Sequence, residues 1–562
     1  MSATEAASPA AAAGRESIDI ERLVVWGVTL AVAVPLGLFF LYPLVAILGR
    51  SLSTPEGLGL ANFAASFGSA RFATLVRNTL AMAFLATALA VGLAFFYAYA
   101  LQRSAIPGKA ALRMIALLPL FAPSLVQAQG LLLLLGRNGI LNRQFGLGID
   151  IYGFSGVVVA NVLYAFPYAF LILSAALAVG DQRLYESAET LGASRWRMFR
   201  DITLPGARYG LAAAAFVAFT LVITDFGNPV VIGGDFNVLA TEVYNQVIGQ
   251  AQFERGAVIG VVLLVPAALA KLVEKRLSRR QFALISAHSK PLEVGRAPWR
   301  DLAFGLYALL VAAVFLSVVG IVVYASFVQL WPYNMTTTLK HYAFDVQNGI
   351  EPLWNSVLVG LASALVGVLM TGLAAIVAHK FRTLLTGPLA FLSILPSAVP
   401  GMVLGLGYIL VFNDPANPLN GLYGTLALIV ILTVYYNHAQ GFLVSSTSLK
   451  QIAQTFDEAA ATLGAGILRT LRTVTLPLLW PTLLGVGVFY FMRSMVSLSA
   501  VIFLVTPSTQ VAAVSVLQLT DRGAYNQAAA FSVCIMGIVL AALFAVQLTL
   551  RVAGVRGVTL IR

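Results

Sequence analysis

Charged residues are scarce in this chain of 562 amino acids. Asp, Glu, Lys and Arg make up only 10% of it, whereas hydrophobic residues make up 59% and the mean hydropathy is +0.88. Because a soluble globular domain carries about 25% charged residues, the composition excludes an ordinary soluble protein. Several apolar runs reach the length of about 20 residues that a membrane-spanning helix needs. The sequence therefore predicts a polytopic membrane protein.

The sequence motifs of several common catalytic and binding sites are also missing. The single cysteine, Cys534, excludes an internal disulfide, and the four histidines show no spacing typical of a metal site. A phosphate-binding loop is absent, because the only Gly-Lys pair, Gly108-Lys109, is followed by alanine. No Gly-x-Ser-x-Gly nucleophile motif occurs. We therefore expect no cofactor, no metal and no catalysis in this chain.

The apolar runs also lack the alternation typical of barrel strands, and they are continuous and rich in Leu, Ala and Val. Only helices and closed barrels satisfy the backbone inside a membrane, so the sequence predicts an all-α fold with about twelve transmembrane helices. They are expected near 23–49, 74–102, 112–135, 152–178, 207–226 and 256–273, and near 303–328, 354–379, 387–412, 421–445, 480–505 and 527–551.

Basic residues outnumber acidic ones, and the net charge is +12. In a soluble protein this would suggest nucleic acid, but here most Lys and Arg cluster in alternate loops, such as 103–113, 183–208 and 271–300. The positive-inside rule places such loops in the cytosol, together with both termini. No cleavable signal peptide is evident at the start of the chain. We expect a multi-pass protein of a bacterial inner membrane, with membrane lipid around it and no nucleic-acid partner.

A polar stretch of about twenty residues occurs twice, and both copies share the frame Glu-x5-Gly-x12-Pro. Equivalent positions differ by 272, as in 458 − 186, and a basic run separates Gly from Pro in each copy. A surface helix between two spans would explain the polarity but not the shared frame. The positions of interest are Glu186, Ala188, Gly192, Leu204 and Pro205 in the first copy, and Glu458, Ala459, Ala460, Gly464, Leu476 and Pro477 in the second.

The repeat extends beyond this stretch. The pattern Leu-Pro-x3-Pro occurs at 118–123 and again at 395–400, and Asn78 and Gly130 recur as Asn355 and Gly407, all 277 positions apart (355 − 78). The sequence therefore predicts two homologous six-helix halves. Two facing halves create a central seam near the middle of the membrane, which is a natural substrate path.

The duplicated frame suits contact with a partner. A helix that breaks at Gly gives a helix–turn–helix, and Leu-Pro then starts the next span. The frame EAA-x3-G-x9-I-x-L-P resembles the signature of binding-protein-dependent ABC importer permeases, in which this loop docks on the nucleotide-binding subunit. The second copy matches it with Val474 in place of Ile, and the first copy has Ser187 where Ala is usual.

This resemblance implies a fused permease of the type I (methionine-permease-like) fold, which forms both membrane halves of an importer working by alternating access. It implies two copies of an ATPase subunit and a periplasmic solute-binding protein as partners, with ATP hydrolysed in the ATPase. We expect a disordered cytosolic tail at 1–22, a first permease half at 23–273, a cytosolic basic linker at 274–302 and a second permease half at 303–562.

The substrate is harder to predict. Fused permeases of this size resemble those for ferric iron, thiamine or 2-aminoethylphosphonate. The segment 225–244 is similar to both the iron and the phosphonate branches, whereas the runs 245–250 and 330–334 look most similar to the phosphonate group. We therefore expect 2-aminoethylphosphonate as the substrate, with ferric iron or thiamine as the alternative. An ion-coupled secondary transporter is an alternative of another class, although the expected spans offer almost no carboxylates away from their ends.

Arg493 bears on this choice. It lies thirteen positions after Trp480, or roughly 20 Å along a helix, and a charge at such depth usually faces a cavity or a partner. It would attract a phosphonate and repel bare ferric iron. Alternatively, Arg493 reaches the membrane surface or pairs with Asp225 or another acid for structural reasons.

Other polar residues are also candidates for the path. Asn228 follows Asp225, and Tyr435, Tyr436, Asn437 and His438 form a polar cluster in an expected span, where packing between helices is the alternative role. The polar, Gly-rich stretch 225–255 is a candidate periplasmic gate or docking surface, or else a simple connecting loop.

Overall fold

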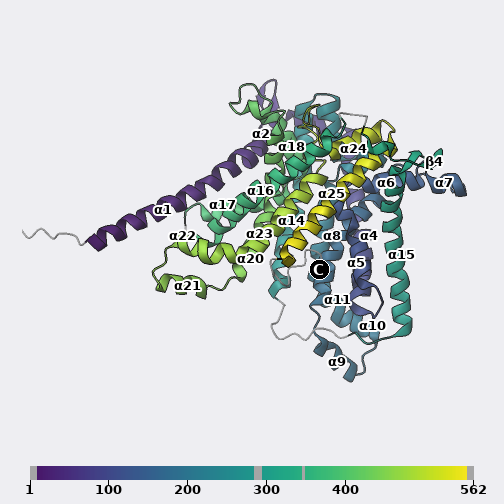
Figure 1. The fold of residues 1–562 in the computed structure, drawn as a ribbon. Coiled ribbons are helices and arrows are strands. Elements are labelled where there is room, and N and C mark those ends of the chain that lie inside the picture. The colour runs from purple at the N-terminus through teal and green to yellow at the C-terminus, as the bar shows by residue number, and fades with distance from the viewer. Residues whose placement is uncertain (1–8, 284–293, 345–348, 382, 553–562) are drawn as a thin grey trace, which may run out of the picture.

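The computed structural model describes residues 9–283, 294–344, 349–381 and 383–552, and this part of the chain is almost entirely helical (Figure 1). Its strands form two short antiparallel hairpins. They are β1 (Ser53–Thr54) with β2 (Gly57–Leu58), and β3 (Val328–Leu330) with β4 (Asn334–Thr337). The expected all-α fold is confirmed.

The helices and helical turns of the first half of the chain are α1 (Pro9–Leu36), η1 (Gly37–Leu41), α2 (Tyr42–Leu52), α3 (Ala61–Phe67), α4 (Ala70–Arg103), α5 (Lys109–Leu117), η2 (Leu118–Phe121), α6 (Leu125–Leu135), α7 (Ile140–Phe145), α8 (Phe154–Ala178), α9 (Gln182–Thr190), α10 (Arg195–Met198), η3 (Phe199–Thr203), α11 (Leu204–Ile223), α12 (Gly227–Ile232), α13 (Leu239–Tyr244), η4 (Asn245–Gly249) and α14 (Phe253–Ala283). Those of the second half are α15 (Pro298–Ser326), η5 (Lys340–Tyr342), α16 (Glu351–Lys380), α17 (Thr386–Ile394), η6 (Leu395–Ala398), α18 (Gly401–Phe412), η7 (Asn420–Leu422), α19 (Leu426–Tyr436), α20 (His438–Gln451), α21 (Thr455–Thr462), α22 (Ile467–Thr470), η8 (Leu471–Thr475), α23 (Leu476–Val496), α24 (Ala512–Asp521) and α25 (Tyr525–Val552).

The first described residues belong to a helix, and part of it falls in the segment 1–22 that the sequence assigns to a cytosolic tail. Residues 9–22 belong to α1, and residues 1–8 lie outside the described part. The Ala-rich start of this segment has high helix propensity and continues directly into an apolar span. The helix therefore extends beyond the expected boundary at residue 23.

Nine helices of the described residues are long and apolar enough to cross a membrane, or twelve if each of three bent pairs is one span. This confirms the expected number, but the spans near 112–135, 387–412 and 421–445 are broken rather than straight. The chain bends by 106° between η2 and α6, by 111° between η6 and α18, and by 52° between α19 and α20. Pro123 and Pro400 lie in the first two breaks, where proline supplies no amide to continue a helix.

Two further spans begin earlier than expected. The helices expected near 207–226 and 480–505 run without a break from Arg195 to Ile223 and from Ile467 to Val496. The prediction that Leu-Pro starts each span is therefore wrong. Because proline removes one helical amide, the chain forms a π-helical turn just before it, η3 in the first half and η8 in the second.

The two halves exchange their first helices. α15 of the second half packs against α4, α5 and α6 of the first, and in return α1 packs against α16 and α17 and α2 packs against α18 (Figure 1). Glycines occupy two of the crossings. A Cβ added to Gly130 would lie 2.5 Å from the Val318 carbonyl oxygen, and one added to Gly407 would lie 2.8 Å from the Pro43 carbonyl oxygen. The duplicated glycine therefore marks the site where the other half crosses.

The duplicated asparagine has the same role in both halves. Asn78 at the start of α4 donates to the Asn237 carbonyl oxygen at 3.1 Å, and Asn355 at the start of α16 donates to the Gln510 carbonyl oxygen at 3.0 Å. Each bond ties a long helix to the loop before α13 or α24. This correspondence confirms that the sequence repeat is a repeat of structure.

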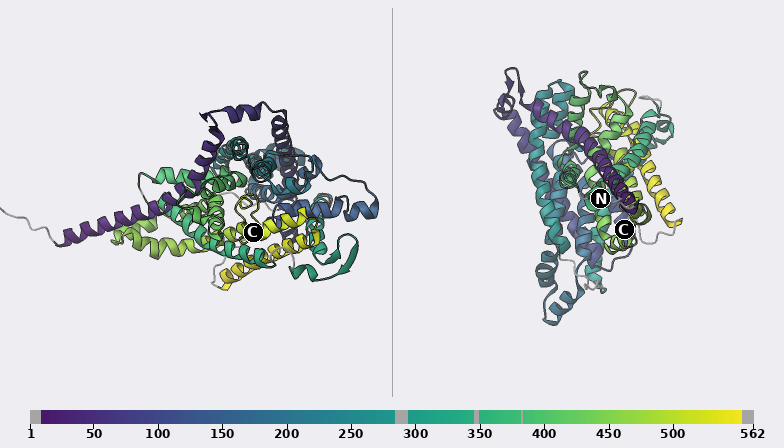
Figure 2. Two further views of the ribbon diagram at one scale, coloured as in Figure 1. Left: turned by 90° about the horizontal axis from the view of Figure 1, so that it is seen from above. Right: turned by 90° about the vertical axis from the view of Figure 1, so that its left-hand side faces the viewer.

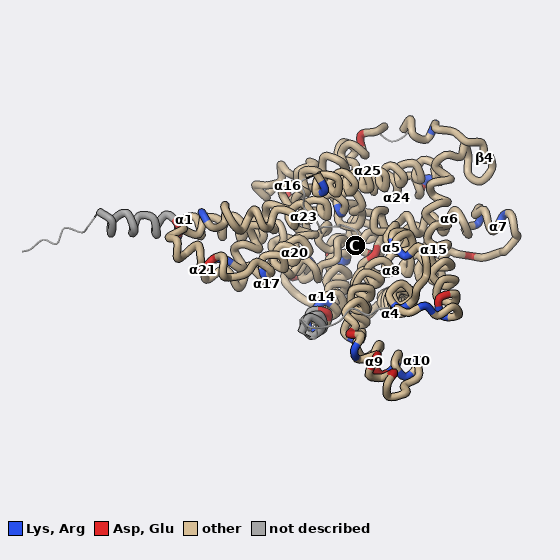
Figure 3. The backbone as a smooth tube through the Cα atoms, turned by 60° about the horizontal axis from the view of Figure 1, so that its bottom comes forward, with Lys and Arg blue, Asp and Glu red and all other residues tan. Residues whose placement is uncertain are grey.

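The repeated loops lie at separate extremities of the molecule. Figures 1 and 3 show α9–α10 at one tip and α21 at another, and Figure 3 shows charged residues gathered at loops and helix ends. We call the side that carries both tips the loop face. The side with α7, α24 and the β3–β4 hairpin is the opposite face, as the views in Figures 1 and 2 show.

Candidate functional site

Two adjoining cavities of about 50 and 110 Å³ lie between the halves, beside the breaks in the helices. Residues of η2, α8 and α11 line them from the first half, and residues of η6, α19, α20 and α23 line them from the second. The two cavities share Leu221, Thr224, Tyr436 and Arg493. We call them together the central cavity.

The central cavity is built from equivalent positions of the repeat. Tyr164 on α8 and Tyr436 on α19 differ by 272 (436 − 164), and both line the cavity. Leu221 on α11 and Arg493 on α23 differ by the same number (493 − 221). The backbone arrangement is thus repeated, whereas the charge is not, because the second half places a guanidinium where the first half has leucine.

Arg493 is half-buried and reaches across the seam. Its Nε donates to Oδ1 of Asn437 at 3.3 Å, and one of its terminal nitrogens donates to the hydroxyl of Tyr168 in the first half at 3.3 Å. Both partners are neutral. The guanidinium is therefore not neutralised by an ion pair with any residue that the structure describes, although Asp225 and the Lys271–Glu274 ion pair also line the central cavity.

Asp225 lines the same cavity but does not neutralise Arg493. Its buried carboxylate accepts from the Asn228 amide at 3.1 Å, and among the described residues no ion pair joins it to Arg493. The alternative that the two charges pair is wrong. Asn228 is fully buried, and its side-chain oxygen accepts from the Ala128 amide at 3.2 Å. It therefore holds α12 against α6 and does not line the central cavity.

The polar cluster at 435–438 divides at the bend between α19 and α20. Tyr436 and Asn437 line the central cavity. Tyr435 and His438 are buried on another side, where their rings stack with centroids 6.0 Å apart and Nε2 of His438 lies 3.3 Å from Oγ of Ser393. Consecutive residues of a helix point in different directions, so all four side chains could not face one cavity.

The loop-face segments have nearly identical backbones. Gly192 follows the end of α9 with φ +73°, and Gly464 follows the end of α21 with φ +71°. The amides that follow donate to the carbonyl oxygens of Ala188 and Ala460, both at 2.9 Å. Glycine adopts this left-handed conformation readily. The shared Gly of the sequence frame is therefore a helix-ending residue in both copies.

The acidic residues and the Leu-Pro pairs of both frames are exposed on these segments. The carboxylate of Glu186 accepts from the Gln182 side chain at 2.7 Å, and Glu458 lies at the equivalent position in the first turn of α21. Ala459 is exposed beside Glu458, so little side-chain bulk covers the backbone there. The remaining members, Leu204, Pro205, Leu476 and Pro477, lie at the starts of α11 and α23.

Exposed apolar side chains on both loop-face segments were missed by the sequence analysis. Leu191 and Leu463, which precede the two glycines, are each 86% exposed. The neighbouring pairs Leu184 with Phe456 and Trp196 with Leu468 are also exposed, and every pair is 272 positions apart, as in 463 − 191. Matching apolar surfaces of this kind mark interaction sites. The common offset was the signal that could have found them.

Each loop-face segment is tethered to the end of a long helix by different chemistry. In the first half, the guanidinium of Arg103 at the end of α4 lies 5.4 Å from the ring centroid of Tyr185. In the second half, Lys380 at the end of α16 forms an ion pair with Asp457. The tethers occupy equivalent positions, since 380 − 103 is 277 and 457 − 185 is 272.

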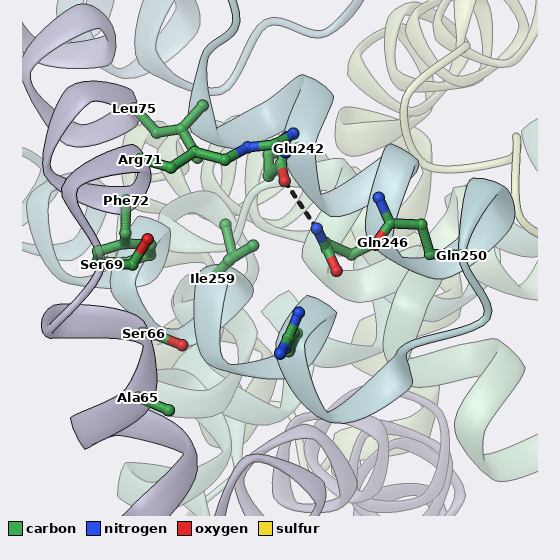
Figure 4. A pocket seen from close by; sticks show the side chains of 11 residues that line it. Ala65, Ser66, Ser69, Arg71, Phe72, Leu75, Glu242, Gln246, Gln250 and Ile259 are labelled. Carbon is green, nitrogen blue, oxygen red and sulfur yellow. Dashed lines mark hydrogen bonds and ion pairs between the residues drawn. The ribbon is translucent and has the colours of Figure 1, made fainter.

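A third cavity, of about 200 Å³, lies in the stretch 225–255 and beside the start of α4. Glu242 is buried there, pairs with Arg71 at 3.2 Å and accepts from Nε2 of Gln246 at 2.7 Å. Figure 4 shows these side chains converging, with Gln250 beside them. Arg255 also lines this cavity, so its surface is polar and carries two guanidinium groups.

Comparison with known proteins identifies the class. Residues 90–283 and 370–554 each match the family described as binding-protein-dependent transport system inner membrane component. The chain belongs to this family. It is therefore a multi-pass inner-membrane permease subunit of an ABC importer, and the alternative of an ion-coupled secondary transporter is set aside. It is a transport subunit rather than an enzyme, and ATP is hydrolysed by a separate partner.

Individual relatives differ in the substrate that their names state and in how much of this chain they match. The chain is 30% identical over 540 residues to the ferric transport system permease protein FbpB of Actinobacillus pleuropneumoniae, covering 92% of this chain and 77% of that protein. It is 32% identical to FbpB 1 of Haemophilus influenzae, which is named as a candidate ferric permease. This match covers 75% of this chain and 69% of that protein. PhnV of Salmonella paratyphi A, named as a candidate 2-aminoethylphosphonate permease, is 29% identical but covers only 36% of this chain.

Proposed function

We propose that the chain is the permease subunit of a ferric iron importer. The observation that carries the proposal is the extent of the match, since the similarity to a ferric transport permease covers 92% of the chain and that to PhnV covers 36%. The expected substrate, 2-aminoethylphosphonate, rested on the short runs 245–250 and 330–334 and is replaced by the iron alternative.

The central cavity is the proposed path. Arg493 by itself would repel bare ferric iron, because each unit of positive charge at 4 Å from its guanidinium costs about 4 kcal/mol at an effective dielectric constant of 20. We therefore propose that iron crosses with anionic ligands that compensate its charge. Arg493 would donate charge-assisted hydrogen bonds to these ligands, with Tyr436 and Asn437 beside it and Asp225 on the other wall.

The loop-face segments are the proposed docking sites for two copies of the ATPase. Each offers an acidic residue, Glu186 or Glu458, beside an exposed leucine and a helix end fixed by glycine. Burying a leucine contributes about 1.5–3 kcal/mol, so this surface gives the contact its affinity. Movement of a segment passes to the cavity through the unbroken helices 195–223 and 467–496, which is how ATP binding would drive alternating access.

We infer from the proposed docking that the loop face and both termini lie in the cytosol and that the opposite face lies in the periplasm. The solute-binding protein would then dock on the opposite face. The polar cavity around Arg71, Glu242 and Arg255 lies there and offers positive charge to acidic residues of that protein.

Uptake of radiolabelled ferric iron tests the substrate. The chain is expressed with its ATPase and its binding protein in cells that lack their own ferric importer. We expect iron uptake that requires ATP and that excess 2-aminoethylphosphonate does not reduce. Uptake of labelled 2-aminoethylphosphonate without uptake of iron would overturn the proposal.

A further inference from the structure

The second loop-face segment is held by a residue from the far end of the chain. The amide of Ile467, the first residue of α22, donates to a carboxylate oxygen of Glu21 on α1 at 3.1 Å. The first amides of a helix have no partner within the helix, and an acceptor beside them stabilises the helix start. Glu21 therefore caps the 30-residue helix Ile467–Val496.

The first half achieves the same end with a residue of its own. Ser194 precedes α10, and its hydroxyl accepts from the Arg197 amide at 3.3 Å. The position equivalent to Ser194 is Gly466 (466 − 194 is 272), and both have extended backbones, with φ/ψ of −66°/158° and −67°/163°. The second half thus keeps the cap conformation but lacks a side chain to fill it.

Glycine at 466 also makes room for the substitute. A Cβ at this position would overlap the same carboxylate oxygen of Glu21 that accepts from Ile467. In the second half, the Glu21 carboxylate therefore takes the place of the serine hydroxyl that caps the helix in the first half. α1 is positioned to supply the carboxylate, because it packs against α16 and α17 and runs beside α22 (Figures 1 and 2).

We propose that Glu21 is a positioning residue that fixes the second loop-face segment from α1, while the first segment is fixed by its own Ser194. Only the second segment then depends on the N-terminal helix for its orientation toward an ATPase. The consequence for transport rests on the proposed docking role of these segments, whereas the cap itself does not.

Backbone amide hydrogen exchange of the full complex tests the cap directly. With Glu21→Ala, we expect exchange at 467–470 to rise about fivefold, the typical effect of losing a cap, and exchange at 195–198 to stay unchanged. Ser194→Ala is the matched control and should give the opposite pattern. Glu21→Gln keeps an acceptor oxygen and should retain most of the protection.

A reciprocal variant makes the test specific. Gly466→Ser alone should displace the flexible Glu21 carboxylate and supply its own hydroxyl as the cap, so exchange at 467–470 should stay low. The double variant Glu21→Ala/Gly466→Ser should regain protection, since it rebuilds the cap of the first half. Unchanged exchange in Glu21→Ala, or no recovery in the double variant, would overturn the proposal.

ATPase activity stimulated by the binding protein separates the two levels of the argument. A fall in Glu21→Ala that the double variant restores supports the positioning role. If exchange changes as expected while ATPase activity and uptake do not, the cap stands and the positioning role of Glu21 is refuted, whereas the docking role of the segment is tested separately by the exposed leucines.

Discussion

The two loop-face segments have the same backbone but different supporting contacts. Their glycines have φ angles of +73° and +71°, and the leucines before them are equally exposed. Yet a cation–π contact tethers one segment and an ion pair the other, and one is capped by its own serine and the other by Glu21. Duplication has preserved the surface offered to a partner, while the contacts behind it have diverged.

The central cavity shows the opposite pattern. There the divergence lies on the surface itself, because Leu221 of the first half corresponds to Arg493 of the second. On the proposed path, a substrate in the seam would therefore meet a guanidinium on one side only. The comparison of the halves therefore predicts two equivalent ATPase contacts and one asymmetric substrate path. The following variants test this prediction.

The largest effect is expected from Arg493→Leu, which makes the second half resemble the first. Loss of a charge-assisted contact costs about 1.5–3 kcal/mol, so uptake should fall at least about tenfold while the complex still assembles. Uptake assays on matched amounts of purified complex measure this. The double variant Leu221→Arg/Arg493→Leu should recover part of the uptake if transport needs a positive charge in the cavity but does not depend on which half carries it. Wild-type uptake by Arg493→Leu would remove this residue from the path.

Nearly as large an effect is expected at the docking leucines. Leu191→Asp and Leu463→Asp should each weaken ATPase binding by about tenfold or more, because burial of a leucine is lost and a charge is introduced. Pull-down of the ATPase by the permease measures this, and the two single variants should behave alike. Leu58→Asp is the control, since Leu58 is 81% exposed on β2. If only one variant lowers ATPase binding, the docking surfaces are not equal.

Much of this fold could be predicted from the sequence because the repeat is recorded in residues with a single structural role. Gly192 and Gly464 end helices, Gly130 and Gly407 lie at crossings, and their spacing revealed two halves. Hydropathy gave the number of spans, since a helix that crosses the membrane must be apolar throughout.

Contacts between distant segments could not be predicted in this way. Arg493 was recognised as a charge within a span, but its partner Tyr168 lies 325 residues away. The bend at Asn437 has no proline to announce it. Exposed leucines such as Leu191 are inconspicuous in a sequence where hydrophobic residues make up 59%. Only tertiary packing distinguishes a leucine that faces lipid from one that faces a partner.

A smaller effect is expected where the first helices cross. Gly130→Ala forces Cβ against the backbone of α15 and should destabilise the protein by about 1–3 kcal/mol. Gly407→Ala should cost somewhat less, because its Cβ meets backbone at 2.8 Å rather than 2.5 Å. Thermal unfolding in detergent measures both. Gly320→Ala is the control, since no atom lies within 4 Å of its added Cβ and alanine favours the helix. Equal stability of Gly130→Ala and Gly320→Ala would contradict a close crossing.

The smallest effect separates the two tethers by their response to salt. Asp457→Asn removes the ion pair with Lys380, which is partly exposed, and should lower the stability by at most about 1 kcal/mol. Because salt screens exposed charges, this loss should shrink between about 0.1 M and 1 M salt. Tyr185→Leu removes the ring that lies over Arg103. The resulting loss of stability should vary less with salt, because part of the lost stability comes from packing and from the hydrogen bond between the hydroxyls of Tyr185 and Thr203. Melting temperatures at the two salt concentrations measure the difference. The same salt dependence for both variants would contradict the assignment of one tether to an ion pair and the other to a cation–π contact.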